Sequence, residues 1–137
     1  MRLTVSASLV IAAAAMLGCA GSGPTDLTAE QRLEQQLPGR WAEVVPPMSG
    51  QIVMDLSVTD SVISGTGQYT VEAGRSGTLV VTGKIRGANA DMSLTFDDNS
   101  VYDFNATIDL SHRLTGAYWL AQPGVDPIMK SFTKITL

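Results

Sequence analysis

The stretch GQIVMDLSV, residues 50–58, decides the fold class of this chain. Its apolar side chains Ile52, Met54, Leu56 and Val58 recur at every second position, with mostly polar residues between them. This period of two is typical of a β-strand that buries one face and exposes the other. The same period recurs as far as the end of the chain, so we expect eight strands. They are predicted at residues 40–46, 50–58, 61–72, 77–86, 90–97, 100–110, 113–121 and 127–136.

The connections between these strands are two to five residues long and contain turn-forming residues, such as Pro46-Pro47 and Asp98-Asn99. Connections of this length cannot cross over a sheet, so consecutive strands should pair antiparallel. Eight such strands with one apolar face are stabilised best by closing on themselves, which leaves no unpaired edge. The predicted fold class is therefore all-β, an eight-stranded antiparallel up-and-down β-barrel.

One phase of the pattern is predicted to face the barrel interior, and it includes Leu110 at the end of the sixth strand. In the last strand Ile128 and Phe132 have one phase and Ile135 the other, so a β-bulge is expected near Thr133-Lys134. Four glycines also have the inward phase, and we expect them to permit the tight coiling of a small barrel rather than to contact a ligand. They are Gly65, Gly67, Gly83 and Gly116.

A short helix is predicted just before the strands, at residues 28–36. Thr28 can cap its first turn, and Gln31 completes the reciprocal capping-box pattern. Leu33 can pack against the following domain, and Pro38-Gly39 ends the helix. A helix of this length needs that packing for stability.

The tripeptide Gly39-Arg40-Trp41, which follows the short helix and opens the first of eight strands, resembles the lipocalin and wider calycin pattern. The resemblance covers residues 28–137 and implies that Trp41 plugs the closed end of the barrel. A basic residue of the last strand commonly packs over that tryptophan, and Lys134 is the candidate here. Two features depart from lipocalins: the first loop has only four or five residues, and the chain is short. Avidin-like barrels of similar size are an alternative.

The start of the chain has the pattern of an export signal. Arg2 precedes an apolar run over Leu9–Leu17, which is shorter than the roughly 20 residues that span a bilayer. The quartet Met16-Leu17-Gly18-Cys19 resembles a bacterial lipobox, although Met16 and Leu17 are not its commonest residues. The resemblance implies that residues 1–18 are a signal peptide cleaved before a lipidated Cys19. The alternative is an ordinary signal peptide with a chance cysteine.

Lipidation would account for Cys19, the single cysteine of the chain. Two or three acyl chains on it would anchor the protein stably, whereas one chain binds a membrane only marginally. By the sorting rule of such lipoproteins, Ala20 after the cysteine implies delivery to the outer membrane of a bacterial cell envelope. Residues 19–27 are predicted to form a flexible tether, and residues 28–137 the β-barrel domain.

Composition argues against several functions. The chain has 9 basic and 13 acidic residues and no basic cluster, which argues against nucleic-acid binding. His112, the single histidine, lies in a predicted turn, and no Cys/His cluster or Gly-rich phosphate loop is present. Asp97-Asp98-Asn99 has an ordinary turn composition without the spacing of a calcium loop. We therefore expect no enzyme activity, no metal and no cofactor.

Two classes of function remain open. All three tyrosines have the inward phase near the barrel end opposite Trp41, which suits a lipid or other small apolar ligand with a polar tip. The predicted ligand-binding residues are Tyr69, Tyr102, Phe104 and Tyr118. Alternatively, side chains fill the barrel, since eight strands leave little room, and the domain is a module that binds another envelope protein. A pocket of about 300 Å³ or more at the tyrosine end would favour the ligand.

Overall fold

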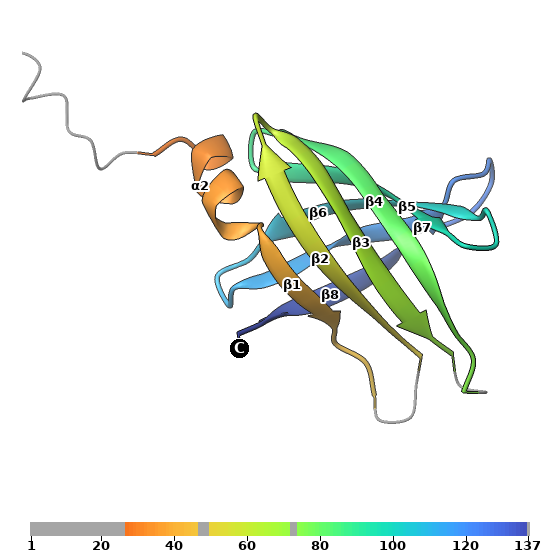
Figure 1. Ribbon diagram of the computed structural model, residues 1–137. Helices are drawn as coiled ribbons and strands as arrows, with labels where there is room; N and C mark the ends of the chain where they lie inside the picture. The colour runs from red at the N-terminus through yellow and green to blue at the C-terminus, as the bar shows by residue number, and fades with distance from the viewer. Residues whose placement is uncertain (1–26, 47–49, 72–73, 137) are drawn as a thin grey trace, which may run out of the picture.

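The computed structural model describes residues 27–46, 50–71 and 74–136. In these residues the helix α2 (Ala29–Gln36) precedes eight strands that pair in sequence order and close into a barrel (Figure 1). This confirms the predicted fold class. The strands are β1 (Gly39–Glu43), β2 (Gln51–Thr59), β3 (Val62–Thr70), β4 (Ser76–Arg86), β5 (Asn89–Phe96), β6 (Val101–Ile108), β7 (Arg113–Leu120) and β8 (Ile128–Ile135). The predicted signal peptide, most of the tether and Cys19 lie outside the described residues.

The capping box predicted for the helix is present. The backbone N–H of Gln31 donates to Thr28 Oγ1 at 3.1 Å, and the backbone N–H of Thr28 donates to Gln31 Oε1 at 2.9 Å. The helix is tied to the β2–β3 turn, where Ser61 Oγ lies 2.7 Å from a carboxylate oxygen of Glu30 and 2.8 Å from one of Glu34. These contacts hold α2 at the barrel end where β1 begins (Figure 1).

The barrel closes between β1 and β8, and here one prediction is wrong. The pairing runs without interruption from Arg40 opposite Ile135 to Glu43 opposite Phe132, so there is no bulge at Thr133-Lys134. The inward phase of β8 instead includes two lysines, Lys130 and Lys134, whose ammonium groups are hydrogen-bonded. Ile135 takes the outward phase and is 37% exposed. A regular strand is possible because the charged ends of both lysines find acceptors.

A second correction concerns Leu110, which is fully exposed rather than inward. Strand β6 ends at Ile108, and a turn stabilised by Asp109 follows it. Asp109 Oδ1 accepts the backbone N–H groups of Ser111 at 2.8 Å and Arg113 at 3.0 Å. These hydrogen bonds also place the pKa of Asp109 below its ordinary value. The strand therefore ends before Leu110, and the turn places this side chain outside the barrel.

The closed end of the barrel is sealed around Trp41, which is 1% exposed as predicted. Its indole N–H donates to the carbonyl oxygen of Leu37 at 2.8 Å, and Lys134 Nζ lies 5.4 Å from the centre of its ring. Lys134 also donates to the carbonyl oxygen of Gln36 at 2.7 Å. The end of α2 therefore provides acceptors both for the buried indole of Trp41 and for the exposed ammonium of Lys134 that lies over it.

Close approach of neighbouring strands explains the inward glycines. A Cβ built on Gly116 would lie 1.9 Å from the carbonyl oxygen of Asn105, and one built on Gly83 would lie 2.2 Å from that of Asp91. Real Cβ atoms do not come so near to backbone oxygen, so any side chain here would force the strands apart. The glycines therefore serve barrel coiling, as predicted.

Candidate functional site

The barrel is open at the end away from α2, and a pocket of about 410 Å³ lies in this mouth. Its volume falls within the range of about 300–1,000 Å³ found for small-molecule sites. The walls are largely apolar or aromatic: Ile52, Tyr69, Phe96, Tyr102, Tyr118 and Ile128. Polar side chains lie at the inner wall and the rim: Glu43, Gln51, Asp98, Ser100 and Lys130. The pocket therefore combines a broad apolar surface with a few polar groups.

The aromatic wall is a continuous series of rings from β3 round to β7. Tyr69 meets Phe96 edge to face with 5.1 Å between ring centres, and Phe96 meets Tyr102 in the same way at 5.4 Å. Tyr102 and Tyr118 are stacked, with ring centres 4.8 Å apart and planes 6° apart. These separations are typical of stabilising aromatic pairs. The wall is therefore held in place by its own contacts, without a ligand.

Three of the four predicted ligand residues, Tyr69, Tyr102 and Tyr118, line this pocket. Phe104 does not, because its side chain is fully buried below the pocket. Its ring centre lies 6.1 Å from that of Tyr118 and 5.3 Å from that of Phe132. Phe104 follows Tyr102 by two residues on β6, about 6.6 Å further into the barrel. It therefore supports the floor of the pocket instead of facing a ligand.

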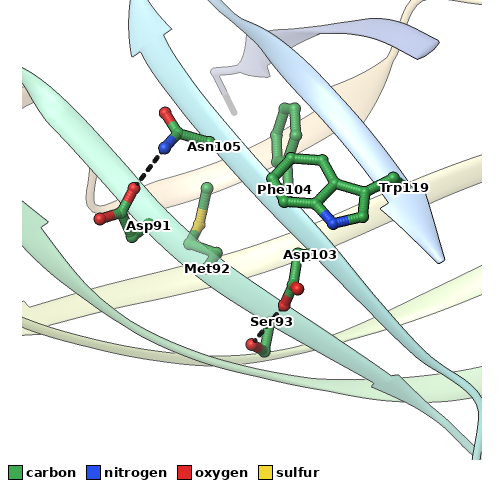
Figure 2. Close-up of a pocket in the computed structure, with 7 residues that line it drawn as sticks. All are labelled: Asp91, Met92, Ser93, Asp103, Phe104, Asn105 and Trp119. Carbon is green, nitrogen blue, oxygen red and sulfur yellow. Dashed lines mark hydrogen bonds between the residues drawn. The ribbon is translucent and has the colours of Figure 1, made fainter. Parts of the chain in front are cut away.

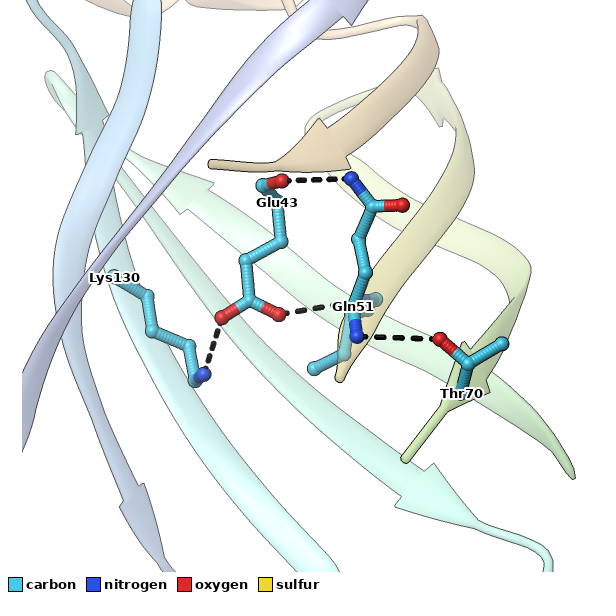
Figure 3. Close-up of polar contacts among 5 residues, drawn as sticks. Glu43, Gln51, Thr70 and Lys130 are labelled. Carbon is cyan, nitrogen blue, oxygen red and sulfur yellow. Dashed lines mark hydrogen bonds and ion pairs between the residues drawn. The ribbon is translucent and has the colours of Figure 1, made fainter. Parts of the chain in front are cut away.

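A buried ion pair in the mouth is the main feature that sequence reasoning missed. Glu43 is only 7% exposed, and one of its carboxylate oxygens accepts a hydrogen bond from Lys130 Nζ (Figure 3). The other oxygen accepts the backbone N–H of Ile52 at 3.1 Å, and Gln51 Nε2 donates to the Glu43 carbonyl at 2.9 Å. Where the backbone pairing of β1 with β2 ends, the Glu43 carboxylate thus takes the place of a backbone carbonyl as the acceptor for β2.

The signal for this pair is present in the sequence. Glu43 follows Trp41 by two residues, and Lys130 precedes Phe132 by two, so both share the inward phase of a buried aromatic residue. Barrel closure makes the first and last strands neighbours. A regular last strand would therefore have placed a carboxylate and an ammonium together inside, but the expected bulge obscured the phase of Lys130.

Lys130 also contacts the aromatic wall, because its Nζ lies 4.8 Å from the centre of the Tyr118 ring. Such a cation–π contact is favourable, more so when it is shielded from water. Burial of the Tyr118 hydroxyl raises its pKa well above the ordinary value, and the nearby Tyr102 and Glu43 raise it further. Tyr118 therefore keeps its proton at physiological pH.

The rim of the pocket is formed by the β5–β6 turn. Tyr69 OH donates to Asp97 Oδ1 at 2.8 Å, and the Thr78 backbone N–H donates to Asp97 Oδ2 at 3.0 Å. The hydrogen bond to Asp97 raises the pKa of Tyr69. Hydrogen bonds from the Ser100 side chain and backbone lower the pKa of Asp98, so that carboxylate is negative at neutral pH. As predicted, residues 97–99 are a turn, with the φ of Asn99 at 70°.

Besides a hollow of about 280 Å³ beside α2 and the β6–β7 turn, two hollows on the strands of the barrel are less suited to binding than the mouth. One, of about 220 Å³, lies on β5–β7 beside Trp119 (Figure 2). Its polar residues already pair across the strands: Asn105 Nδ2 donates to Asp91 Oδ1 at 2.6 Å, and Ser93 Oγ to Asp103 Oδ1 at 3.0 Å.

The other outer hollow, of about 760 Å³, extends from β8 over β1 to β4 and is lined by no aromatic ring. Its two charged residues, Arg40 and Asp55, bind each other at 2.8 Å. Although it is larger, it offers a ligand no aromatic surface. The mouth is therefore the stronger candidate.

Other features of the described residues add no reactive group. His112 is exposed in the β6–β7 turn, at the closed end and away from the pocket, with φ at 60°. No three His, Cys, Asp or Glu side chains in the described parts of the chain are grouped as a metal site would need. Within the same parts, no helix has the length and hydropathy required to cross a membrane.

Comparison with known proteins finds no protein-family model, no curated protein and no solved structure that matches this chain. The function is therefore argued from the geometry of the mouth.

Proposed function

We propose that this chain is a lipid-anchored envelope protein whose barrel holds a small amphipathic molecule in its open mouth. The observation that carries the proposal is the pocket of about 410 Å³ walled by Tyr69, Phe96, Tyr102 and Tyr118. Rings held by mutual contacts offer an apolar body a preformed surface, and burying that body contributes about 25 cal/mol per Å² of apolar area. The polar groups of the inner wall and rim would meet the other end of the ligand.

The size of the ligand is limited by the packing below the mouth. Phe104, Leu114 and Phe132 are each 0% exposed, so the lower part of the barrel is filled by its own side chains. A ligand would therefore occupy the mouth alone, with one end near the rim. This arrangement favours a compact molecule over a long lipid chain buried along the barrel axis. We also propose that the barrel is lipocalin-like.

The filled lower barrel also supports a second candidate, a module that binds an envelope protein. At the rim Ile128 is 57% exposed and Met129 70%, and both could contact a protein partner. The two candidates differ in what the mouth does. In the first the aromatic wall contacts a small molecule, whereas in the second the mouth needs no ligand at all.

The anchor proposed for the chain is lipid on Cys19. Because α2 lies at the closed end, the described chain begins at that end, and a tether there would leave the mouth facing away from the membrane. Cys19→Ala should abolish metabolic labelling with palmitate, since the acylated sulfur is removed. A mutant that is still labelled and still membrane-bound would contradict the anchor.

The binding proposal is tested by calorimetric titration of the full chain carrying Cys19→Ser, so that no attached acyl chain competes. The probes are decanol and 2-naphthylethanol, which differ in the shape of their apolar bodies. We expect saturable binding of at least one probe, weakened about tenfold by Tyr118→Ala, because an apolar contact of this size contributes more than about 1 kcal/mol.

His112→Ala, at the opposite end of the barrel, is the matched control and should leave probe binding unchanged. If neither probe binds the folded wild-type chain saturably, the ligand proposal fails and the protein-binding module becomes the leading account. Equal losses in the two variants would also count against the mouth as the site.

A further inference from the structure

The charges in the mouth restrict the kind of polar group that a ligand can carry. Three charged side chains line the pocket: Lys130, Glu43 and Asp98. One cation thus faces two carboxylates, and the cation is already bound to Glu43. The mouth is therefore not a site with a surplus of positive charge, although it contains an ammonium group.

Lys130 still has hydrogen-bonding capacity for a ligand. Its ammonium has three N–H donors, and in the described residues its one hydrogen-bond partner is Glu43. Its Nζ lies 4.8 Å from the centre of the Tyr118 ring, and its side chain is 18% exposed. The ammonium therefore stands between the carboxylate and the aromatic wall, at the lining of the pocket.

Glu43 is fixed in place and cannot withdraw when a ligand enters. One of its oxygens is bound to Lys130 and the other accepts the Ile52 backbone N–H at 3.1 Å. Its side chain is 7% exposed. A second carboxylate approaching Lys130 would lie beside this buried charge and be repelled by it. A cationic head would be repelled by the ammonium of Lys130 and find no acceptor on it, which leaves only the Asp98 carboxylate at the rim to attract it.

Resting on the proposed function, we infer that the mouth selects an amphiphile with an uncharged hydrogen-bond-accepting head, such as a hydroxyl, ester or amide, which Lys130 binds while Glu43 excludes a carboxylate. A neutral oxygen can accept an N–H of Lys130 without breaking the ion pair. Its apolar body then lies against the stacked rings of Tyr102 and Tyr118. Fatty acids are thereby disfavoured relative to their alcohols and esters.

The test compares probes that share one body and differ only in the head. Decanoate, decanol and decylamine form one series, and 2-naphthylacetate, 2-naphthylethanol and 2-naphthylethylamine the other. They are titrated calorimetrically at pH 7 into the full chain with Cys19→Ser. In whichever series binds, we expect the alcohol to bind about tenfold more tightly than the carboxylate.

Glu43→Gln is expected to reverse the order of affinity between the alcohol and the carboxylate. The amide oxygen can still accept the Ile52 N–H, while Lys130 loses its counter-charge and becomes free to bind a carboxylate. In this variant the carboxylate should bind more tightly than the alcohol. The double variant Glu43→Gln/Lys130→Met removes both charges without leaving one unpaired, and it should bind the alcohol more weakly than the wild type does, because the Lys130 donor is gone.

The outcomes separate the two proposals. If no probe of either series binds the wild-type chain, the proposed function fails and the inference with it. If probes bind but the carboxylate is equal or preferred, the inference alone is overturned. An unchanged preference in Glu43→Gln would show that Glu43 is not the excluding group. Should Glu43→Gln fail to fold, the double variant decides, since an affinity for the alcohol equal to that of the wild type would show that Lys130 does not bind the head and would overturn the inference.

Discussion

The two ends of the barrel contain the same kind of contact, between a lysine and an aromatic ring, but the two lysines have different hydrogen-bond acceptors. At each end a lysine of β8 lies over an aromatic ring: Lys134 lies 5.4 Å from the ring centre of Trp41, and Lys130 lies 4.8 Å from that of Tyr118. Lys134 is bound by a neutral carbonyl, that of Gln36, whereas Lys130 is bound by the carboxylate of Glu43. The end of α2 supplies the carbonyl at the closed end, and no helix among the described residues stands over the mouth.

This difference separates stability from binding. The closed end is sealed by apolar packing around Trp41 and by hydrogen bonds to the end of α2, so it stabilises the fold and gives no access to the barrel interior. The mouth keeps Tyr69 and Tyr102 partly exposed and holds the buried pair of Glu43 and Lys130, which is tolerable because each charge is hydrogen-bonded to the other. Changes at the closed end should therefore affect unfolding, and changes at the mouth should affect both unfolding and binding.

The largest effect is expected at the closed end. Trp41→Ala should lower the free energy of unfolding in urea by about 3–5 kcal/mol, because it leaves a cavity in a core that cannot collapse. It also leaves the carbonyl of Leu37 without its indole donor. Probe binding at the mouth should persist in the fraction that stays folded.

Trp119→Ala is the matched control, since Trp119 is partly buried on the outer face of β7. Its loss should be about 1 kcal/mol or less, as for most surface substitutions. Equal losses for the two tryptophans would show that the closed end is not the main source of stability. The contrast between the ends would then lose its basis.

The sequence predicted the barrel because the period of two and the short connections constrain strands locally. Prediction failed at Leu110, where a local turn around Asp109 ends the strand early, and at β8, where the outcome depends on groups far apart in the chain. Lys130 can face inward only because Glu43, 87 residues away, supplies a carboxylate. The three tyrosines could be placed by phase alone, whereas the depth of Phe104 and the charge of the mouth follow from how β1, β6 and β8 meet in the closed barrel.

The next effect concerns the two lysines. Lys130→Met should cost about 2–3 kcal/mol of unfolding free energy, because it strands the buried carboxylate of Glu43 in a partly open site. Lys134→Met removes one hydrogen bond to a neutral carbonyl and one cation–π contact, so it should cost about 1 kcal/mol. Both values are measured by urea unfolding at pH 7.

A double variant sharpens this comparison. Glu43→Gln/Lys130→Met should restore stability to within about 1 kcal/mol of the wild type, because no charge is then left unpaired. If the double variant is less stable than Lys130→Met alone, the cost at the mouth comes from lost packing and not from a stranded charge. The two ends would then differ only in how their side chains pack and not in how their charges are paired.

The smallest effect is a pH dependence that belongs to the mouth. Burial raises the pKa of Tyr118 above its ordinary value of 10.0, so the folded chain favours the protonated phenol. Its contribution to stability is complete below about pH 10 and is lost as the pH rises through the raised pKa. Relative to Tyr118→Phe, the wild-type chain should lose at most about 1.4 kcal/mol of unfolding free energy by pH 11.

Urea unfolding of both proteins at pH 8 and pH 11 measures this difference. Because Phe cannot titrate and both proteins contain the same lysines, the comparison subtracts the effect of lysine deprotonation. A wild-type curve parallel to that of Tyr118→Phe would mean that the Tyr118 hydroxyl reaches water freely, and the mouth would then be more open than the stacked rings of Tyr102 and Tyr118 imply.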